Sequence, residues 1–390
     1  MTFVTVALGG FRGLLADILW VRASSLQDEG RFIELAQLAD WITRLEPRYP
    51  EVWAYHAWNM AYNVSVLFPD PQDRWRWVQN GLRLLRDEGI SSNPGDSSLY
   101  WELGWLYADK VSGRMDEAGL FYRISFAAEM NSLLHGSRPD YDAIRQTPPR
   151  ASDFSRAGLD PAVMASIDAQ YGPLDWRLPE THSIYWGARG RGLKTGRAIW
   201  CERLVVQGME SSFREGALFF DPALRLYVRG PRPDLAAKAV RGWLAELREP
   251  EDSLASLPAE NALREALVCL ALFGDDRDAA AAFSLLKRRA PEAAKGLDLK
   301  PFVAGEVKLR TPVSDAAGRD IVLGFLVRGR LWKALGRPAF AEGYAKLARL
   351  CFDAAPETAH LLRPEDEWAD LNDLAAKTAA DQLPEVLRNK

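Results

Sequence analysis

The chain has 390 residues, of which 48% are apolar and 26% are charged, a balance typical of a globular protein rather than a disordered one. Its 49 Lys and Arg residues against 53 Asp and Glu residues give a net charge of −4, which argues against a dedicated nucleic-acid-binding protein. The three cysteines lie far apart and indicate neither a disulfide framework nor a zinc site.

The N-terminal segment Met1–Leu15 begins with an apolar run that is too short to cross a membrane by itself. It also lacks the basic start and the cleavage site of a signal peptide. Gly9-Gly10 within it suggests a hinge. Two interpretations remain open: a buried first helix, or a segment that associates with a membrane or with another subunit. We accordingly expect a membrane-associated protein, with a cytoplasmic one as the alternative.

After this segment, apolar residues recur at helical spacing and predict pairs of helices. Gly30 separates the first two helices, and Glu46-Pro47 ends the second. Pro50 then opens a third helix, and the turn Pro69-Asp70-Pro71 leads into a fourth over 73–87. The first ninety residues therefore predict two helical hairpins.

The segment Asp96–Phe126 predicts the clearest hairpin. Tyr100, Leu103, Gly104 and Tyr107 share one helical stripe, Ser112-Gly113 breaks the helix, and Ala118 and Tyr122 lie one turn apart in the next. The small Gly104 allows a close crossing, and we expect it to face Ala118. These residues resemble the tetratricopeptide repeat (TPR), whose pattern is W-x2-L-G-x2-Y followed by A-x3-F.

The second half continues the hairpins with interruptions. The Pro-rich segment 131–180 predicts a long insertion with one helix at Ala162–Gln170, and 222–234 and 301–312 predict two further linkers. Between them we expect hairpins at 182–209, 259–289 and 320–352, besides a helix at 235–247. The expected domains are 1–130 with TPR-like hairpins, the insertion 131–180, and 181–390 with further TPR-like hairpins.

The TPR resemblance implies an all-α fold, a degenerate solenoid of helical hairpins with insertions. Segments of the first half, such as FRGLLADILWVRA, look like bacterial TPR proteins, relatives that usually carry an N-terminal hydrophobic anchor. The resemblance implies a non-enzymatic scaffold or assembly subunit of a bacterial complex, with protein partners. The alternative is a helical glycan-processing or glycan-binding protein.

Tryptophan is unusually frequent, with 14 residues, 11 of them before position 201. Large aromatic residues serve either a helical core or an exposed binding surface. Residues off the interlocking stripe of the first helix in each hairpin would line the groove of a solenoid. The predicted partner-binding residues in the groove are Tyr55, Trp58, Asn59, Tyr62, Asn63, Trp101 and Trp105. Two more, Trp176 and Arg177, lie in the loop 173–186, which Pro173 and Pro179 hold extended. The competing interpretation is structural: the groove aromatic residues pack beneath the insertion 131–180, and Trp176 packs against the end of a hairpin.

No pattern predicts catalysis, a cofactor or a metal. A glycan-processing enzyme needs two carboxylates flanking one bond, and the spacing of the available carboxylates marks no acid–base pair. Gly187–Thr195 misses the P-loop because Leu193 intervenes before Lys194. The four histidines are remote from one another in the sequence. The carboxylates available to an enzyme are Glu102, Asp109, Asp116 and Glu117.

Overall fold

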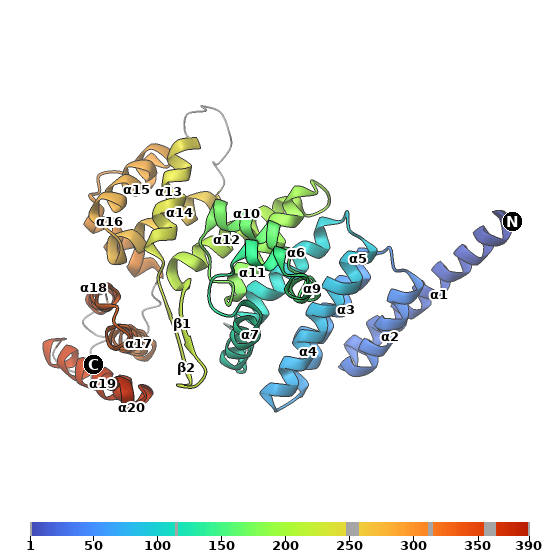
Figure 1. Ribbon diagram of the computed structural model, residues 1–390, viewed down its shortest axis with the longest axis horizontal. Coiled ribbons are helices and arrows are strands. Elements are labelled where there is room, and N and C mark those ends of the chain that lie inside the picture. The colour runs from blue at the N-terminus through green and yellow to red at the C-terminus, as the bar shows by residue number, and fades with distance from the viewer. Residues whose placement is uncertain (1, 114–115, 247–256, 311–314, 355–363, 389–390) are drawn as a thin grey trace. The chain divides into compact units, whose positions relative to one another are not determined.

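The computed structural model describes residues 2–113, 116–246, 257–310, 315–354 and 364–388. Within these ranges, only the backbone is described at 2–12, 243–246, 257–259, 310, 315–317, 386 and 388. The described chain is almost entirely helical, as predicted, and it divides into two compact units (Figure 1). Unit 1 comprises 1–170 and 175–208, and unit 2 comprises 171–174 and 209–390.

Unit 1 begins with three helical hairpins. Their elements are α1 (Thr2–Asp28), α2 (Phe32–Leu45), α3 (Pro50–Trp58), η1 (Asn59–Val64), η2 (Ser65–Leu67), α4 (Pro71–Arg83), η3 (Leu84–Gly89), α5 (Ile90–Ser92), α6 (Ser97–Leu106), η4 (Tyr107–Val111) and α7 (Gly119–Leu134). Pro50 and Pro71 stand at the first turns of α3 and α4, where a missing N–H costs nothing. The predicted breaks at Gly30, Glu46-Pro47 and Ser112-Gly113 fall where the structure ends a helix. The fourth helix, predicted over 73–87, starts two residues earlier and continues through η3 and α5 to Ser92.

Three continuations, η1, η3 and η4, are π-helical, which the sequence pattern did not predict. Such segments shift the phase of the side chains that follow them and occur frequently at functional sites. The helix α1 runs through Gly9-Gly10 without a break, so the predicted hinge is wrong. The apolar side chains before position 13 lie outside the described ones. None of the described helices combines the length and hydrophobicity needed to cross a membrane.

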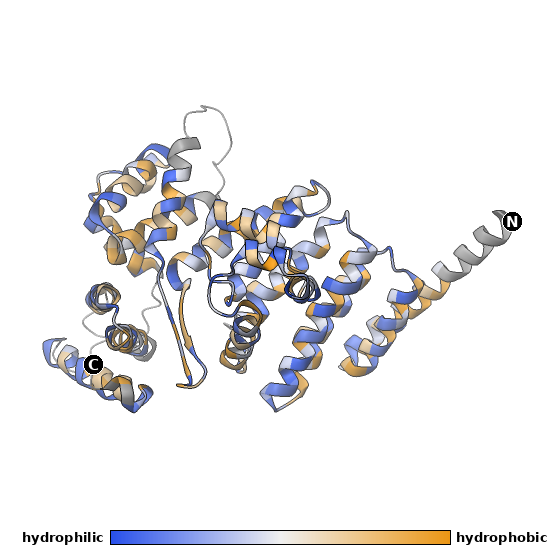
Figure 2. Ribbon diagram, viewed as in Figure 1, coloured by the Kyte–Doolittle hydropathy of each residue, from blue (hydrophilic) through white to orange (hydrophobic). Residues whose placement is uncertain are grey.

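The insertion holds three short helices rather than the one predicted. They are α8 (Tyr141–Gln146), α9 (Pro148–Arg156) and α10 (Pro161–Tyr171), followed by the hairpin α11 (Pro179–Gly192) and α12 (Ala198–Glu215). The largest fully buried side chains of unit 1 include Trp176, Trp186, Tyr122 and Tyr185. Most helices carry both hydrophobic and hydrophilic residues along their length (Figure 2).

The close crossing at Gly104 joins α6 to α11 and α12. A Cβ atom on Gly104 would lie 2.5 Å from Leu204 Cδ2, 3.3 Å from the Ser183 carbonyl oxygen and 3.4 Å from Trp186 Cβ. The expectation that Gly104 faces Ala118 is therefore wrong. The small residue is needed, as predicted, but its neighbours come from a hairpin about eighty residues later.

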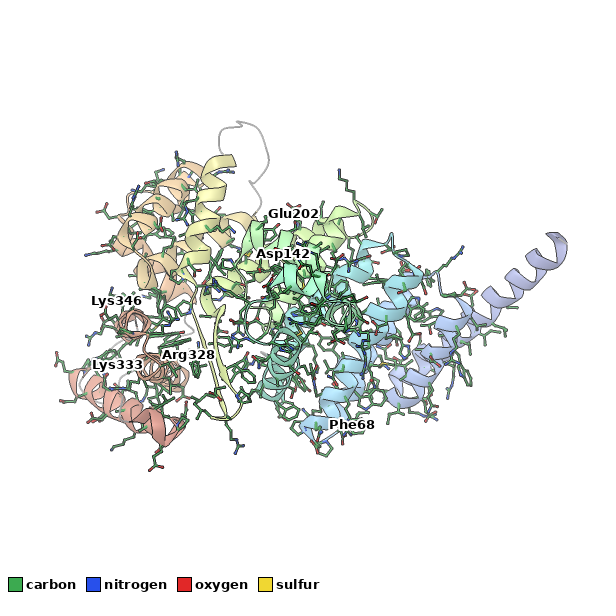
Figure 3. The ribbon with its side chains drawn as sticks, viewed as in Figure 1. Phe68, Asp142, Glu202, Arg328, Lys333 and Lys346 are labelled. Carbon is green, nitrogen blue, oxygen red and sulfur yellow. The ribbon has the colours of Figure 1, made fainter. Side chains whose placement is uncertain are left out.

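Unit 2 holds a β-hairpin and further helices. Its elements after α12 are β1 (Ala217–Asp221), β2 (Leu226–Gly230), α13 (Pro233–Glu246), α14 (Leu257–Phe273), α15 (Asp276–Arg289), η5 (Pro291–Ala294), α16 (Leu299–Arg310), α17 (Asp315–Ala334), α18 (Pro338–Ala354), α19 (Pro364–Gln382) and α20 (Glu385–Arg388). The strands are antiparallel, with Phe219 opposite Val228. Two predicted linkers are thus wrong, because 222–234 contains β2 and 301–312 lies mostly in α16. In this unit Arg328, labelled in Figure 3, donates to Glu215 at 3.0 Å.

Candidate functional site

Partly exposed aromatic side chains follow one another across the hairpins of unit 1. We call this set the aromatic row: Trp20 of α1, Tyr55 and Trp58 of α3, Tyr62 of η1, Trp105 and Trp101 of α6, and Trp200 of α12. Every member keeps part of its surface accessible, and Trp200 is 50% exposed. Because large aromatic residues are usually buried, a connected series that reaches solvent is a candidate binding surface.

Ring contacts connect the row. Centroids lie 5.3 Å apart for Trp20 and Tyr55, and 5.6 Å apart for the stacked pair Trp58 and Tyr62. Within one helix, Tyr55 and Trp58 are three residues apart and so neighbour each other. In α6 and α12, two further contacts complete the row: Trp101 stacks on Trp105 at 5.8 Å and meets Trp200 edge-on at 6.4 Å.

The link between the second and third hairpins is a polar cluster at Tyr62. Its hydroxyl donates to Asp109 Oδ2 at 2.6 Å and also receives a hydrogen bond from the Trp105 side chain. Burial, reinforced by the bond to Asp109, raises the pKa of Tyr62, so its hydroxyl stays protonated and remains a donor. The π-helical turns η1 and η4 place Tyr62 and Asp109 at this junction.

Behind Tyr62, a buried ion pair supports the junction. Lys110 is 4% exposed, lies 5.1 Å from the Tyr62 ring centre and donates to Asp116 Oδ2 at 2.5 Å. Burial acts to raise the pKa of Asp116, but the bonds from Lys110 and from the Ala118 N–H lower it overall. The carboxylate therefore stays charged and opens the second helix of the hairpin, near the position that the sequence predicted.

At the far end of the row, a guanidinium covers Trp101. Arg197 lies 4.4 Å from that ring centre and 4.0 Å from Glu102, which is 9% exposed. Burial raises the pKa of Glu102 to about 7, although the Arg197 charge opposes the rise. A carboxyl group that titrates near neutrality, beside an aromatic surface, is suited to accept or donate a hydrogen bond to a bound molecule.

Of the nine predicted site residues, the structure brings Tyr55, Trp58, Tyr62, Trp101 and Trp105 together in the row. The two amides take structural roles. Asn59 is fully buried and donates to the Phe32 carbonyl at 3.3 Å, while the half-exposed Asn63 donates to Asn59 Oδ1 at 3.0 Å. Of these two amide side chains, only that of Asn63 is accessible to a partner.

The two loop residues lie inside unit 1. Trp176 is fully buried and donates to Asp168 Oδ2 at 3.2 Å. Arg177 is 7% exposed and makes a two-point contact with Asp175, at 2.9 and 2.7 Å. Their burial favours the packing interpretation of this loop over a contact surface.

Sequence reasoning missed Trp20, Trp200 and Arg197. Trp20 is an aromatic residue in the first predicted helix, so the sequence alone could have marked it as a candidate. By contrast, Trp200 and Arg197 lie about a hundred residues after Trp101, and no local pattern reveals that contact.

The carboxylates considered for catalysis have different surroundings. Asp109 accepts from Tyr62, Asp116 accepts from Lys110, and the Glu117 side chain is 93% exposed. Among the described residues, no group of three His, Cys, Asp or Glu side chains is placed to hold a metal ion. No protein-family model, curated protein sequence or solved structure matches this chain.

Proposed function

We propose that this protein is a non-enzymatic scaffold built of TPR-like hairpins, and that the aromatic row of unit 1 binds an extended segment of a protein partner. The observation that carries the proposal is the connection of the row across four hairpins of unit 1, from Trp20 of α1 to Trp200 of α12. A ligand that follows such a row must itself be long and narrow, which suits a polypeptide in extended form.

The chemistry of the row fits a peptide backbone with apolar side chains. Trp58 and Trp101 offer apolar area with few rotatable bonds, so little conformational entropy is lost when a partner binds. Arg197 lies over the Trp101 ring with Glu102 beside it, so a guanidinium and a carboxyl group stand at this end of the row for hydrogen bonds with a peptide backbone. Asn63, next in sequence to Tyr62, adds a partly exposed amide. The buried Lys110–Asp116 pair fixes the junction beneath, so the surface is ordered before a partner arrives.

Site-specific photo-crosslinking in native cells tests the proposal. A photoreactive amino acid replaces Trp200, at one end of the row, and in a matched control replaces Trp41, which is 59% exposed but does not belong to the row. We expect a polypeptide adduct at position 200 whose mapped site lies in an extended segment, and no such adduct at position 41. Equal labelling at the two positions contradicts the proposal.

The captured segment is then synthesised and its affinity is measured by calorimetry. Trp58→Ala and Trp105→Ala should each weaken binding by about 2 kcal/mol, roughly thirty-fold in Kd, as for central aromatic residues of an interface. Trp41→Ala should leave the affinity unchanged. If oligosaccharides bind the wild type and depend on Trp58 and Trp105 while the peptide does not, the glycan-binding alternative replaces this proposal.

We also propose that the N-terminal segment Met1–Leu15, together with the part of α1 that follows it, attaches the scaffold to a membrane or to another subunit. Leu14, Ile18 and Val21 of α1 share one helical face and are 57%, 56% and 70% exposed. The joint variant Leu14→Gln with Ile18→Gln should release the protein from lipid vesicles or shift it to a smaller species in light scattering. A wild-type protein that is monomeric and does not sediment with vesicles contradicts the attachment.

A further inference from the structure

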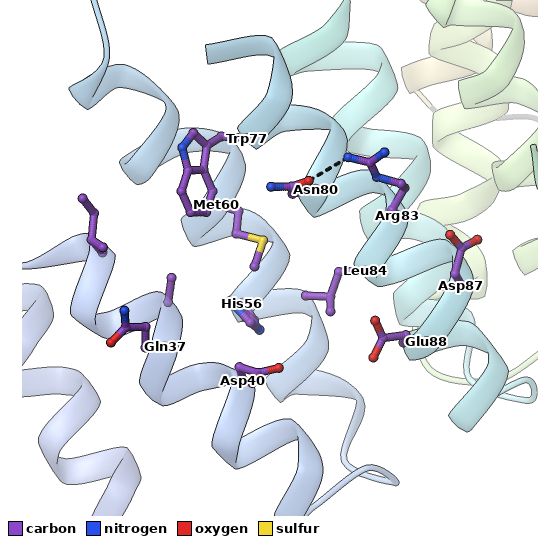
Figure 4. A pocket seen from close by; sticks show the side chains of 12 residues that line it. Gln37, Asp40, His56, Met60, Trp77, Asn80, Arg83, Leu84, Asp87 and Glu88 are labelled. Carbon is purple, nitrogen blue, oxygen red and sulfur yellow. Dashed lines mark hydrogen bonds between the residues drawn. The ribbon is translucent and has the colours of Figure 1, made fainter. Parts of the chain in front are cut away.

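A pocket of unit 1 lies on a different face of α3 from the aromatic row. It has a volume of about 590 Å³ and is lined by α2, α3, η1, α4 and η3 (Figure 4). His56 of α3 and Met60 of η1 line it, whereas Tyr55 and Trp58 belong to the row. The close packing of Gly81 on the Ala57 carbonyl, 2.8 Å from a Cβ position, holds α4 against α3 beside the pocket.

The His56 side chain is the anomaly of this pocket. It is 1% exposed, and neither ring nitrogen has a hydrogen-bond partner among the described residues. Leaving a buried donor and acceptor unpaired is costly, so such a group calls for an explanation. Burial lowers the pKa of His56 to about 4, although Asp40 opposes the shift, so the ring is neutral at pH 7. It therefore offers one donor and one acceptor.

Charged side chains of both signs line the pocket or lie beside it. Asp40, Asp87 and Glu88 contribute carboxylates, and Arg83 contributes a guanidinium, which donates to Asn80 at 2.7 Å (dashed in Figure 4). Two of these carboxylates form ion pairs with arginines. Asp40 pairs with Arg44, whose side chain is 74% exposed, and Asp87 pairs with Arg86. With these partners counted, three guanidinium groups stand against three carboxylates. The Arg44 partner of Asp40 lies largely in solvent, where its attraction is weak, so Asp40 remains able to pair with a cation in the pocket.

Apolar side chains complete the wall. Met60 and Leu84 flank the His56 ring, and Trp77 stands above them in the view of Figure 4, stacked on Phe68 at 6.1 Å. The described residues hold no group of three carboxylate, His or Cys side chains suited to a metal ion. The pocket thus combines a negative group, a neutral imidazole and an apolar wall, and these three features together match an organic amine.

We propose that this pocket binds an alkylammonium group, with the ammonium between Asp40 and the His56 ring and the alkyl chain against Met60 and Leu84. The ammonium donates to the Asp40 carboxylate in a charge-assisted bond and to the unprotonated nitrogen of His56. Because both ring nitrogens are buried in the free protein, binding on this proposal includes a rotation of the His56 ring about its Cβ–Cγ bond, which is a soft torsion. The site is independent of the aromatic row, and its ligand is either a small amine or the lysine side chain of a partner.

Calorimetric titration of the full chain with n-butylammonium at pH 7.5 tests the proposal, with butyrate as the probe of opposite charge. We expect saturable binding of one butylammonium and no binding of butyrate. Asp40→Asn should weaken butylammonium binding at least tenfold. The control Asp73→Asn makes the same change in α4, a helix that also lines the pocket, but at a position that does not line it, and should leave binding unchanged.

His56→Phe separates a binding role from a structural one. It keeps the ring volume and removes both unpaired nitrogens, so the melting temperature should stay equal or rise while butylammonium binding falls at least tenfold. The proposal is overturned if the wild type does not bind butylammonium or if butyrate binds instead. It is also overturned if Asp40→Asn and His56→Phe bind butylammonium with the affinity of the wild type.

A second titration distinguishes the two sources of the amine. Nα-acetyl-lysine methylamide presents the same butylammonium chain on a peptide backbone. Binding at least tenfold tighter than that of butylammonium identifies a lysine side chain as the ligand, because the backbone then adds contacts at the rim. Binding at least tenfold weaker identifies a small amine, because the backbone then clashes there.

Discussion

Replacing Gly104 by leucine is the most direct perturbation of the crossing between α6 and the hairpin α11–α12. A Cβ atom at this position would lie 2.5 Å from the end of the Leu204 side chain, which can move, but also 3.3 Å from the backbone carbonyl of Ser183. Alanine therefore displaces only Leu204. Leucine adds three more heavy atoms in a direction where the Ser183 backbone and Trp186 Cβ leave no room.

These contacts set the expected magnitudes. For Gly104→Ala, the gain in helix propensity of about 1 kcal/mol offsets the cost of displacing Leu204, so the stability of unit 1 should change little. For Gly104→Leu, overpacking at the upper end of the usual range gives a loss of about 3 kcal/mol. In a unit of this size, that loss lowers Tm by about 6–12 °C.

Urea unfolding followed by tryptophan fluorescence measures the change, because most tryptophans lie in unit 1. Gly13→Leu in α1 is the control, since nothing lies within 4 Å of a Cβ at that position and no loss of stability is expected. If Gly104→Leu unfolds within about 0.5 kcal/mol of the wild type, a spread typical of harmless surface substitutions, the crossing is not tight and the reasoning fails.

Two further predictions concern charges in unit 1. The folded-state pKa of Glu102 is raised to about 7 from 4.5, so the folded protein binds the extra proton between these values and loses stability as pH rises from about 4.5 to 7. Glu102→Gln should remove up to about 3 kcal/mol of this pH dependence, and an unchanged profile of unfolding free energy against pH would contradict the assignment. Asp116→Asn leaves the buried Lys110 ammonium without its charged partner and should cost about 3–5 kcal/mol. The exposed Asp73→Asn should cost less than 1 kcal/mol, and equal effects of the two in chemical unfolding would refute the role of burial.

Local chemistry in the sequence determined most of the helices of unit 1. Proline at the start of α3 and α4 and the break at Ser112-Gly113 act on their own neighbours, so their effects can be predicted without the fold. Helical period likewise places Trp101 and Trp105 on one face. The β-hairpin carries strand-favouring residues, Phe219-Phe220 and Leu226-Tyr227-Val228, but the Pro222 turn between them predicts a linker, so the sequence pattern does not predict the hairpin.

Only the tertiary structure decided which faces meet. The sequence requires a small residue at Gly104, but its neighbours lie about eighty to a hundred residues later. The same distance separates Trp101 from Trp200, so the end of the aromatic row could not be predicted. Burial of Trp176 and the unpaired ring of His56 also depend on helices remote in sequence. The physical reason is that periodicity fixes a side chain's direction within its own helix, while its surroundings depend on which helices pack against that face.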